Sequence, residues 1–135
     1  MRGNRSQDTR PEMRVRQLLF RMGCRYRLHR QDLPGRPDVC FLSRRKAIFV
    51  HGCFWHQHES LACPLKGRPR SNLDYWTAKL ERNVERDVSN QARLKDEGWQ
   101  VLVVWECETT KVQSLERRLR RFVGPVRVLG VRSAK

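Results

Sequence analysis

The sequence has few acidic residues, no long apolar run and no secretory segment. Asp and Glu account for 14 of its 135 residues, against 29 Lys and Arg, which gives a formal net charge of +15. Because no stretch is long and apolar enough to cross a bilayer and no signal peptide is visible, we expect no membrane association and a cytoplasmic location. So large a positive charge predicts a polyanionic partner, with nucleic acid as the leading candidate. A basic solvated surface, as in ribosomal proteins, would implicate the same partner.

The cysteine content agrees with an intracellular setting. Five cysteines are present, and an odd number without a secretory segment argues against a disulfide framework and for a reducing compartment. The sequence has no internal repeat, and its length suits one domain with its own core. We therefore expect a single domain over residues 1–135, in which the polar and basic residues 1–8 form a flexible N-terminal arm.

Hydrophobic spacing predicts helices and strands in a mixed order. Thr9 and Glu12 form a capping-box pattern before an apolar helical stripe that Gly23 ends, and Glu12 falls on the buried side of that helix. Gly98 ends a longer helix for which Ser71 or Asn72 suits the N-cap. The arrangement indicates a mixed α/β sandwich. The apolar stripe of the long helix comprises Leu73, Trp76, Leu80, Val84 and Val88, continued by Ala92 or Leu94. The remaining expected elements are strands within 24–28, 39–42, 46–50, 99–105 and 126–131 and a helix over 114–123.

The segment from Val50 to His58 carries side chains suited to metal binding, proton transfer and base stacking. Three histidines, one cysteine and two adjacent aromatic residues follow directly on an apolar strand. Placed at the end of a sheet, this combination indicates chemistry on a nucleic acid.

Asp38 is a candidate magnesium ligand, because it follows Pro37 at the start of a strand. Mg²⁺ takes few protein ligands and stabilises charge on a phosphoryl group. PD-(D/E)xK nucleases carry an acid and a lysine on the next strand, whereas the corresponding strand here ends Phe49-Val50-His51. His51 can substitute for the lysine and a backbone carbonyl for the acid. The alternative is an ordinary turn aspartate.

Glu12 and Asp87 are further candidate acids. The alternative for Glu12 is a helix-capping role without any part in catalysis. Asp87 falls on the apolar stripe of the long helix, where a carboxylate is costly unless it is paired or binds a metal. Pairing with His56 would make Asp87 an orienting group, whereas a salt bridge to a neighbouring arginine is an equal alternative.

The spacing C-x4-H-x4-C, with a fourth cysteine downstream, is compatible with a structural zinc site. Soft thiolate and imidazole ligands suit Zn²⁺. A site with four protein ligands has no open coordination position, so it is structural rather than catalytic. The alternative is a set of unrelated buried cysteines, which is how we interpret Cys24 and Cys40. The candidate zinc ligands are Cys53, His58, Cys63 and Cys107.

Phe54 and Trp55 stand in a loop next to a basic surface, where aromatic rings can insert between base steps. Trp76 can join them, although core packing is its stronger interpretation. Trp99 and Trp105 are expected in the core.

These motifs together resemble the very short patch repair (Vsr) endonucleases. The likeness covers roughly residues 9–110, and its motifs occur in the family's order. They read LPGRPD over 33–38, HGCFWH over 51–56, NVERD over 83–87 and GWQVLVVWEC over 98–107.

The resemblance implies a restriction-endonuclease-like α/β fold, related to PD-(D/E)xK nucleases, with a mixed sheet flanked by helices and a structural zinc site. It implies a Mg²⁺-dependent nick on the 5′ side of the thymine in a T·G mismatch of double-stranded DNA, a product of 5-methylcytosine deamination. Asp38 and the main-chain carbonyl of Val50 match the family's Mg²⁺ ligand positions, and His51, His56 and Asp87 match its catalytic groups.

The resemblance assigns the other candidates as well. Glu12 matches the family's helix glutamate, the four candidate zinc ligands match its Zn²⁺ site, and Phe54, Trp55 and Trp76 match its intercalating aromatics. Val50 stands where one member of the family has threonine; valine keeps the carbonyl ligand but has no hydroxyl. The loop from His58 to Cys63 is longer and lacks the usual histidine run, and the N-terminal arm is short.

The sequence thus predicts a bacterial, nucleoid-associated mismatch-nicking endonuclease. We expect a monomer, linked functionally to a cytosine-5 DNA methyltransferase and a repair polymerase. In the working hypothesis, a Mg²⁺-bound water attacks the scissile phosphate and His56, assisted by Asp87, acts as base. Metal-bound water with His51 serves the leaving group. The alternatives are a Vsr-like or restriction-type nuclease of different mismatch or site specificity, and a non-catalytic zinc-containing DNA-binding module.

Overall fold

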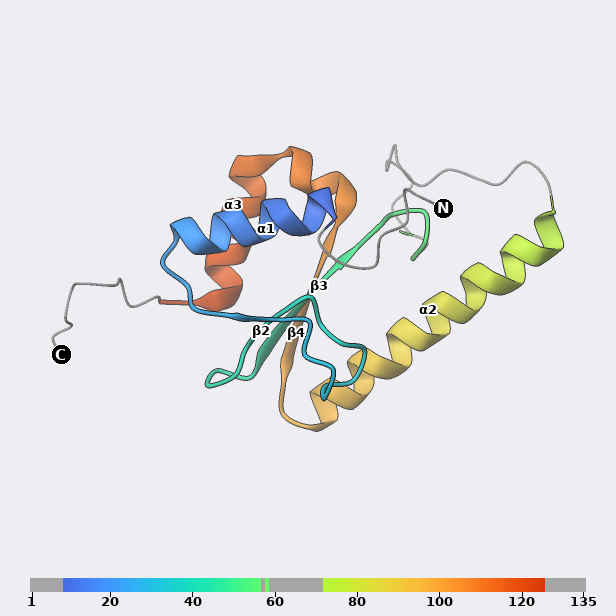
Figure 1. The fold of residues 1–135 in the computed structure, drawn as a ribbon, viewed down its shortest axis with the longest axis horizontal. Helices are drawn as coiled ribbons and strands as arrows, with labels where there is room; N and C mark the ends of the chain where they lie inside the picture. The colour runs from blue at the N-terminus through green and yellow to red at the C-terminus, as the bar shows by residue number, and fades with distance from the viewer. Residues whose placement is uncertain (1–8, 57, 59–71, 126–135) are drawn as a thin grey trace, which may run out of the picture.

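The computed structural model describes residues 9–56, 58 and 72–125. Among them, four strands form one mixed sheet in the order β1-β2-β3-β4, with helices on both of its faces (Figure 1). The strands are β1 (Arg27–Leu28), β2 (Val39–Phe41), β3 (Lys46–His51) and β4 (Gln100–Trp105). The helices are α1 (Arg10–Arg21), α2 (Leu73–Asp96), the 3₁₀ helix η1 (Glu106–Thr110) and α3 (Val112–Val123). No helix in these ranges is long and apolar enough to cross a membrane.

The predicted hairpin and the parallel pairing of the last strand set the topology. β2 pairs antiparallel with β1 and β3, whereas β3 and β4 run parallel, with Val50 opposite Val104 and His51 opposite Trp105. A parallel pair needs a crossover connection, which α2 supplies. The carboxyl ends of β3 and β4 therefore lie side by side, and the residues that follow them meet at one end of the sheet.

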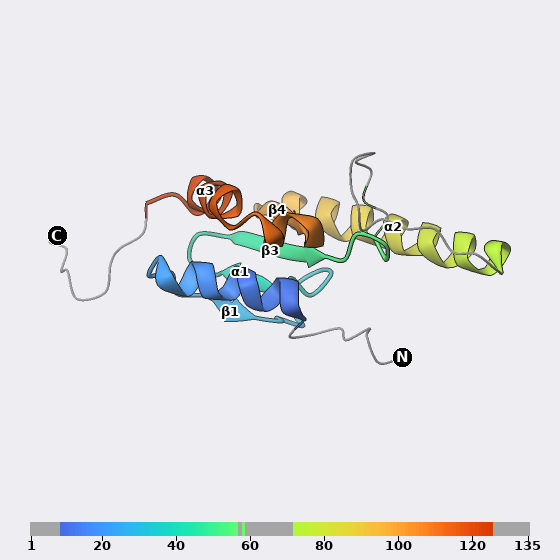
Figure 2. The same cartoon turned by 90° about the horizontal axis from the view of Figure 1, so that it is seen from above.

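The alternation of side chains along the strands divides the core between the two faces of the sheet. Ile48 and Val104 face α1 and α3, and pack with Val15, Leu18 and Leu119 of those helices. On the other face, Ala47, Phe49 and Cys40 pack with Leu94 of α2 and with Trp99. Figure 2 shows the two helices α1 and α3 near the sheet, while α2 extends beyond the end of β3. Both faces are covered, as the continuous apolar run of β4 predicted.

The first helix forms as its sequence predicts. The Thr9 hydroxyl accepts the Glu12 backbone N–H at 3.3 Å, and Gly23, with φ of 85°, follows the helix end. Val15, Leu18 and Leu19 are buried at helical spacing.

The predicted apolar stripe of the long helix is wrong in part. Within α2, all of which the structure describes, only Leu80 and Leu94 are buried, whereas Leu73 and Val88 are 58% and 63% exposed. The reason is that α2 packs on the sheet only near its C-terminal end, and its Asn83–Asp87–Asn90 edge faces a cleft. Asn72 occupies the N-cap position but makes no side-chain cap hydrogen bond. Ser71, the arm of residues 1–8 and the expected strand 126–131 lie outside the described residues.

Candidate active site

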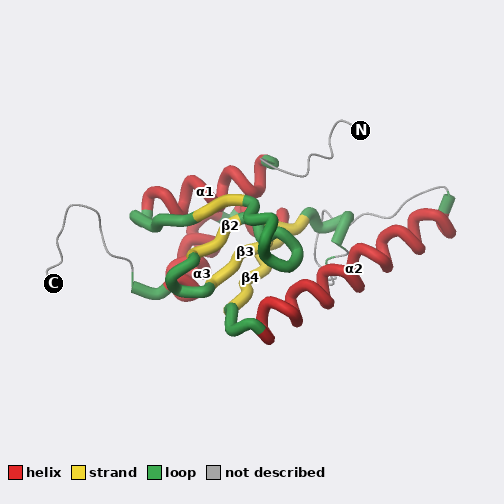
Figure 3. The backbone as a smooth tube through the Cα atoms, turned by 60° about the horizontal axis from the view of Figure 1, so that its bottom comes forward, coloured by secondary structure: helices red, strands yellow, loops and turns green. Residues whose placement is uncertain are grey.

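A cleft of about 1180 Å³ lies where α1, the β1–β2 loop, the end of β3 and α2 meet. The β1–β2 loop passes close to α2 (Figure 3). A side chain at Gly35 of this loop would not fit, because its Cβ would lie 2.9 Å from the Asn90 Cβ. The side chains predicted to be catalytic line this one cleft: Glu12, Asp38, His51, His56 and Asp87. Basic side chains line it too, namely Arg10, Arg14, Arg36, Lys79 and Arg86.

Asp38 stands directly before β2 and bonds to the neighbouring strand. Its Oδ2 accepts the backbone N–H of Val50 at 2.7 Å, which holds the carboxylate at the mouth of the hairpin. Burial raises the pKa of the Asp38 carboxyl to about 6; the Val50 N–H opposes that shift, and the nearby Glu12 charge adds to it. Asp38 is partly buried, and the one hydrogen bond from Val50 only partly offsets the loss of water around its charge, which suits a bound cation.

Glu12 is the buried acid of α1, and its carboxylate lies beside Asp38. Its side chain is 2% exposed, with Oε2 2.5 Å from His29 Nε2 and 3.3 Å from Arg16 Nη1. One potential ligand atom from each of Glu12, His29 and Asp38 lies within 4.8 Å of the other two. Glu12 therefore does more than accompany the helix cap, since its carboxylate is part of the cleft.

His51, His56 and Asp87 form a second group across the cleft. The rings of His51 and His56 stack with centroids 3.8 Å apart and planes 7° from parallel. His56 Nδ1 lies 2.5 Å from Asp87 Oδ2, so the helix orients this imidazole. Burial lowers the pKa of His51 to about 4, with a further contribution from the His56 charge. His51 is therefore neutral at physiological pH.

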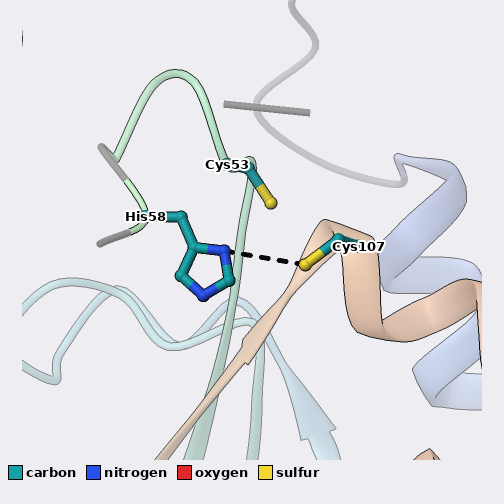
Figure 4. A group of neighbouring side chains, drawn as sticks. All are labelled: Cys53, His58 and Cys107. Carbon is teal, nitrogen blue, oxygen red and sulfur yellow. Dashed lines mark hydrogen bonds between the residues drawn. The ribbon is translucent and has the colours of Figure 1, made fainter. Parts of the chain in front are cut away.

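Cys53, His58 and Cys107 come together at the carboxyl ends of β3 and β4. One ligand atom from each lies within 4.8 Å of the others, and His58 Nδ1 is 3.6 Å from Cys107 Sγ (Figure 4). Cys53 is fully buried, and the ring of Trp105 stacks on His58 at 4.3 Å. Two thiols and an imidazole are the donor set that Zn²⁺ prefers. Cys63, the fourth predicted ligand, lies outside the described residues. Cys24 and Cys40 are buried core residues, as predicted.

Phe54, Trp55 and Trp76 form an aromatic cluster beside the cleft. Their ring centroids are 5.2 to 5.8 Å apart. The Trp55 carbonyl accepts the side-chain amide of Asn83 at 3.1 Å, so α2 positions this loop as well as Asp87. Trp76 joins the cluster and is only partly buried, which corrects the preference for core packing.

Comparison with known proteins identifies the family. Residues 1–62 match the family described as DNA mismatch endonuclease Vsr. The chain is 39% identical over 128 residues to the DNA mismatch endonuclease Vsr of Escherichia coli K12. The aligned segment covers 91% of this chain and 80% of that protein. The chain belongs to the Vsr family. It is therefore a DNA endonuclease.

Other proteins similar to this chain are named Type II nicking enzymes. V.XorIIP of Xanthomonas oryzae pv. oryzae is 53% identical over 121 residues, which is 90% of this chain and 87% of that protein. V.NmeAIP of Neisseria meningitidis is 38% identical over 122 residues, which is 90% of this chain and 85% of that protein.

Two residues of this Vsr-family site were not found from the sequence. His29 contacts Glu12 across 17 positions of the chain, and no spacing rule marks that pair. Trp105 was expected in the core, but it is half-buried and packs on His51, 5.3 Å away edge to face, as well as on His58. Its place opposite His51 in the parallel register was the available signal. Trp99 is buried, as predicted.

Proposed function

We propose that the protein is a Mg²⁺-dependent mismatch endonuclease that nicks one DNA strand 5′ of the thymine in a T·G mismatch, in very short patch repair of deaminated 5-methylcytosine. The observation that carries this proposal is the single cleft that holds Asp38, the His51–His56 stack and Asp87 beside a cluster of three aromatic rings. A protein that only binds DNA has no need for this set. The four-stranded mixed sheet with helices on both faces supports a single restriction-endonuclease-like domain over residues 1–135.

The donor set at Asp38 fits a hard divalent cation. A partly buried carboxylate at the hairpin mouth, with Glu12 within 4.8 Å, offers the oxygen ligands that Mg²⁺ prefers. Asp38 and the main-chain carbonyl of Val50 would hold the ion. Bound there, it would supply a lowered pKa for a coordinated water and stabilisation of phosphoryl charge.

His56 is the proposed general base. With Nδ1 committed to Asp87, its Nε2 remains the proton-accepting atom, and the Asp87 carboxylate stabilises the imidazolium that forms. The neutral His51 ring packs against His56 and fixes its plane. His51 ends β3 and is proposed to serve the leaving group together with metal-bound water.

Cys53, His58 and Cys107 are proposed to hold a structural Zn²⁺ together with Cys63. Such a site would join the loop after β3 to η1 and so brace the segment that carries His56 and the aromatic cluster. Because zinc binding of this kind contributes folding free energy, we expect removal of zinc to abolish the cooperative thermal transition even with Mg²⁺ present. Far-UV circular dichroism against measured zinc content checks this expectation. An apoprotein that melts like the zinc form would contradict the assignment.

Mismatched double-stranded DNA is the proposed substrate. The basic side chains that line the cleft suit phosphate contacts. Phe54, Trp55 and Trp76 are the candidates for insertion next to the mismatch. Action as a monomer and a link to a cytosine-5 methyltransferase and repair polymerase, in a bacterial cytoplasm at the nucleoid, are further parts of the proposal.

The deciding assay uses T·G, other mismatched and fully paired duplexes, each labelled on either strand, incubated with Mg²⁺. We expect one nick, 5′ of the mismatched thymine, in the T·G duplex alone. Asp38→Ala should abolish the nick while the protein stays folded and keeps its zinc content. Asp32→Ala is the matched control, because Asp32 belongs to the same loop but pairs with Arg30 at the surface. A fully active Asp38→Ala protein would disprove the site.

The 53% identity to a protein named a Type II nicking enzyme supports one alternative, a Vsr-like nuclease with another mismatch or site preference. Nicking of a different mismatch or of paired DNA in the same assay would favour this alternative. Binding of the duplexes without any Mg²⁺-dependent nick would favour the DNA-binding module.

A further inference from the structure

His29 connects the two elements that carry the carboxylates of the proposed metal site. Its ring Nε2 lies 2.5 Å from Glu12 Oε2 on α1, and its backbone N–H donates to the Asp38 carbonyl at 3.2 Å. The residue follows β1 directly, and its side chain is 18% exposed on the wall of the cleft. One residue thus contacts the helix that bears Glu12 and the chain segment that bears Asp38.

The backbone of His29 is in an unfavourable conformation. Its φ is 47°, in the left-handed region, which is unfavourable for a residue with a Cβ. Such a conformation persists only where surrounding contacts determine it, and it is enriched at functional sites. Here the hydrogen bond from the His29 N–H to the Asp38 carbonyl holds the backbone, and the contact with Glu12 holds the ring.

Glu12 needs this contact for its position as well as for its charge. A carboxylate with 2% exposure requires bonded partners. Arg16 supplies one, but it lies on the same helix, four residues on, so it cannot fix Glu12 relative to the sheet. His29 reaches Glu12 from the sheet side.

We propose that His29 is a positioning residue, which holds the Glu12 carboxylate toward a divalent cation bound at Asp38. The proposal rests on the metal site of the proposed function. Hydrogen bonds that orient carboxylates around a metal typically change metal affinity or activity by about 10–100-fold. His29 itself is not a ligand in this scheme, because its Nε2 is committed to Glu12.

Three substitutions separate positioning from a backbone role. His29→Gln places an amide N–H at the same number of bonds from Cβ as Nε2, so it can still donate to Glu12. His29→Asn tolerates the left-handed conformation but is one bond too short. His29→Gly removes both the ring and the backbone strain. A purely structural turn would accept Asn and Gly and gain nothing from Gln.

The first readout is Mn²⁺ binding to the full-length protein without DNA, followed by the electron paramagnetic resonance signal of free Mn²⁺. We expect His29→Asn and His29→Gly to weaken binding by about 10–100-fold, and His29→Gln to stay within about threefold of wild type. The Mg²⁺ concentration for half-maximal nicking should rise in the same order, with the KM for DNA unchanged. Urea denaturation checks that each variant is folded.

The controls distinguish failure of this inference from failure of the proposed function. Asp38→Asn should abolish Mn²⁺ binding; if it does not, the metal site itself is misplaced. If Asp38→Asn abolishes binding while His29→Asn and His29→Gly keep wild-type affinity, the positioning role is refuted and the metal site stands. If His29→Gln binds Mn²⁺ as weakly as His29→Asn does, the hydrogen-bond explanation is refuted.

Discussion

Replacement of Asp38 by asparagine should stabilise the folded protein while it abolishes Mg²⁺-dependent nicking. Asparagine is nearly isosteric, and its side-chain carbonyl can still accept the Val50 N–H that Asp38 accepts at 2.7 Å. What the substitution removes is a negative charge that the fold has taken out of water. Without a bound cation, this charge on Asp38 lowers the stability of the folded protein.

The size of the effect follows from the pKa of Asp38, which burial raises from 3.8 to about 6. The native carboxyl holds its proton to a higher pH than the unfolded one, so wild-type stability falls as pH rises from about 4 to about 6 and then levels off. A shift of about two units corresponds to about 3 kcal/mol at pH 8 and to about 1 kcal/mol at pH 4.5. Asparagine mimics the protonated form, so the variant should gain these amounts.

Urea unfolding at pH 4.5, 6 and 8, in buffer without added Mg²⁺ and with zinc content verified, measures the difference. The lowered pKa of His51 also makes stability depend on pH, but it does so in the wild type and in Asp38→Asn alike and therefore cancels in the difference. Added Mg²⁺ should stabilise only the wild type, because binding to the folded state alone raises stability. Asp32→Asn is the surface control and should show no gain. An Asp38→Asn variant that is less stable at pH 8, or whose gain does not grow with pH, would refute the argument.

Three further substitutions test other parts of the structure. Lys46→Met should lower stability by about 1–2 kcal/mol in urea unfolding with nicking unchanged, because Lys46 Nζ donates to the last carbonyls of α3, 2.6 Å from Phe122 O. Asp87→Asn should lower kcat by about 10²-fold or more with little change in KM, since it removes the negative charge that stabilises the imidazolium of His56; an unchanged kcat would dismiss the base assignment. Trp55→Ala should weaken binding to mismatched DNA by about 1–3 kcal/mol in a fluorescence titration, and equal loss for paired DNA would count against intercalation.

Local patterns predicted most of the elements because they depend on neighbouring residues. The Thr9 cap, the buried face of α1, the hairpin and the apolar run of β4 each follow from spacing within a few positions. The face of α2 could not be predicted in the same way. Val88 fits a helical stripe, but it is exposed because the sheet ends before most of α2 is reached.

The site shows the same limit. Asp38, His51 and His56 belong to short motifs, so the sequence marks them, and Asp87 could be paired with His56 because a carboxylate on an apolar stripe needs a partner. The approach of His29 to Glu12 depends on how α1 lies across the sheet edge, which no local pattern encodes. The left-handed backbone of His29 is likewise set by tertiary contacts.

The charges in the cleft explain why a basic surface alone would not bring a phosphate to Asp38. Glu12, Asp38 and Asp87 place three carboxylates around the proposed reaction centre, and His51 adds no positive charge because its pKa is lowered to about 4. The arginines and Lys79 on the cleft lining attract the DNA backbone, but a phosphate at the centre would face mainly negative groups. A divalent cation at Asp38 reverses the local sign and also removes the burial cost of that carboxylate. The same ion would therefore favour folding and phosphate docking, so DNA affinity at the cleaved position and protein stability should rise together with Mg²⁺ in the wild type, and neither should respond in Asp38→Asn.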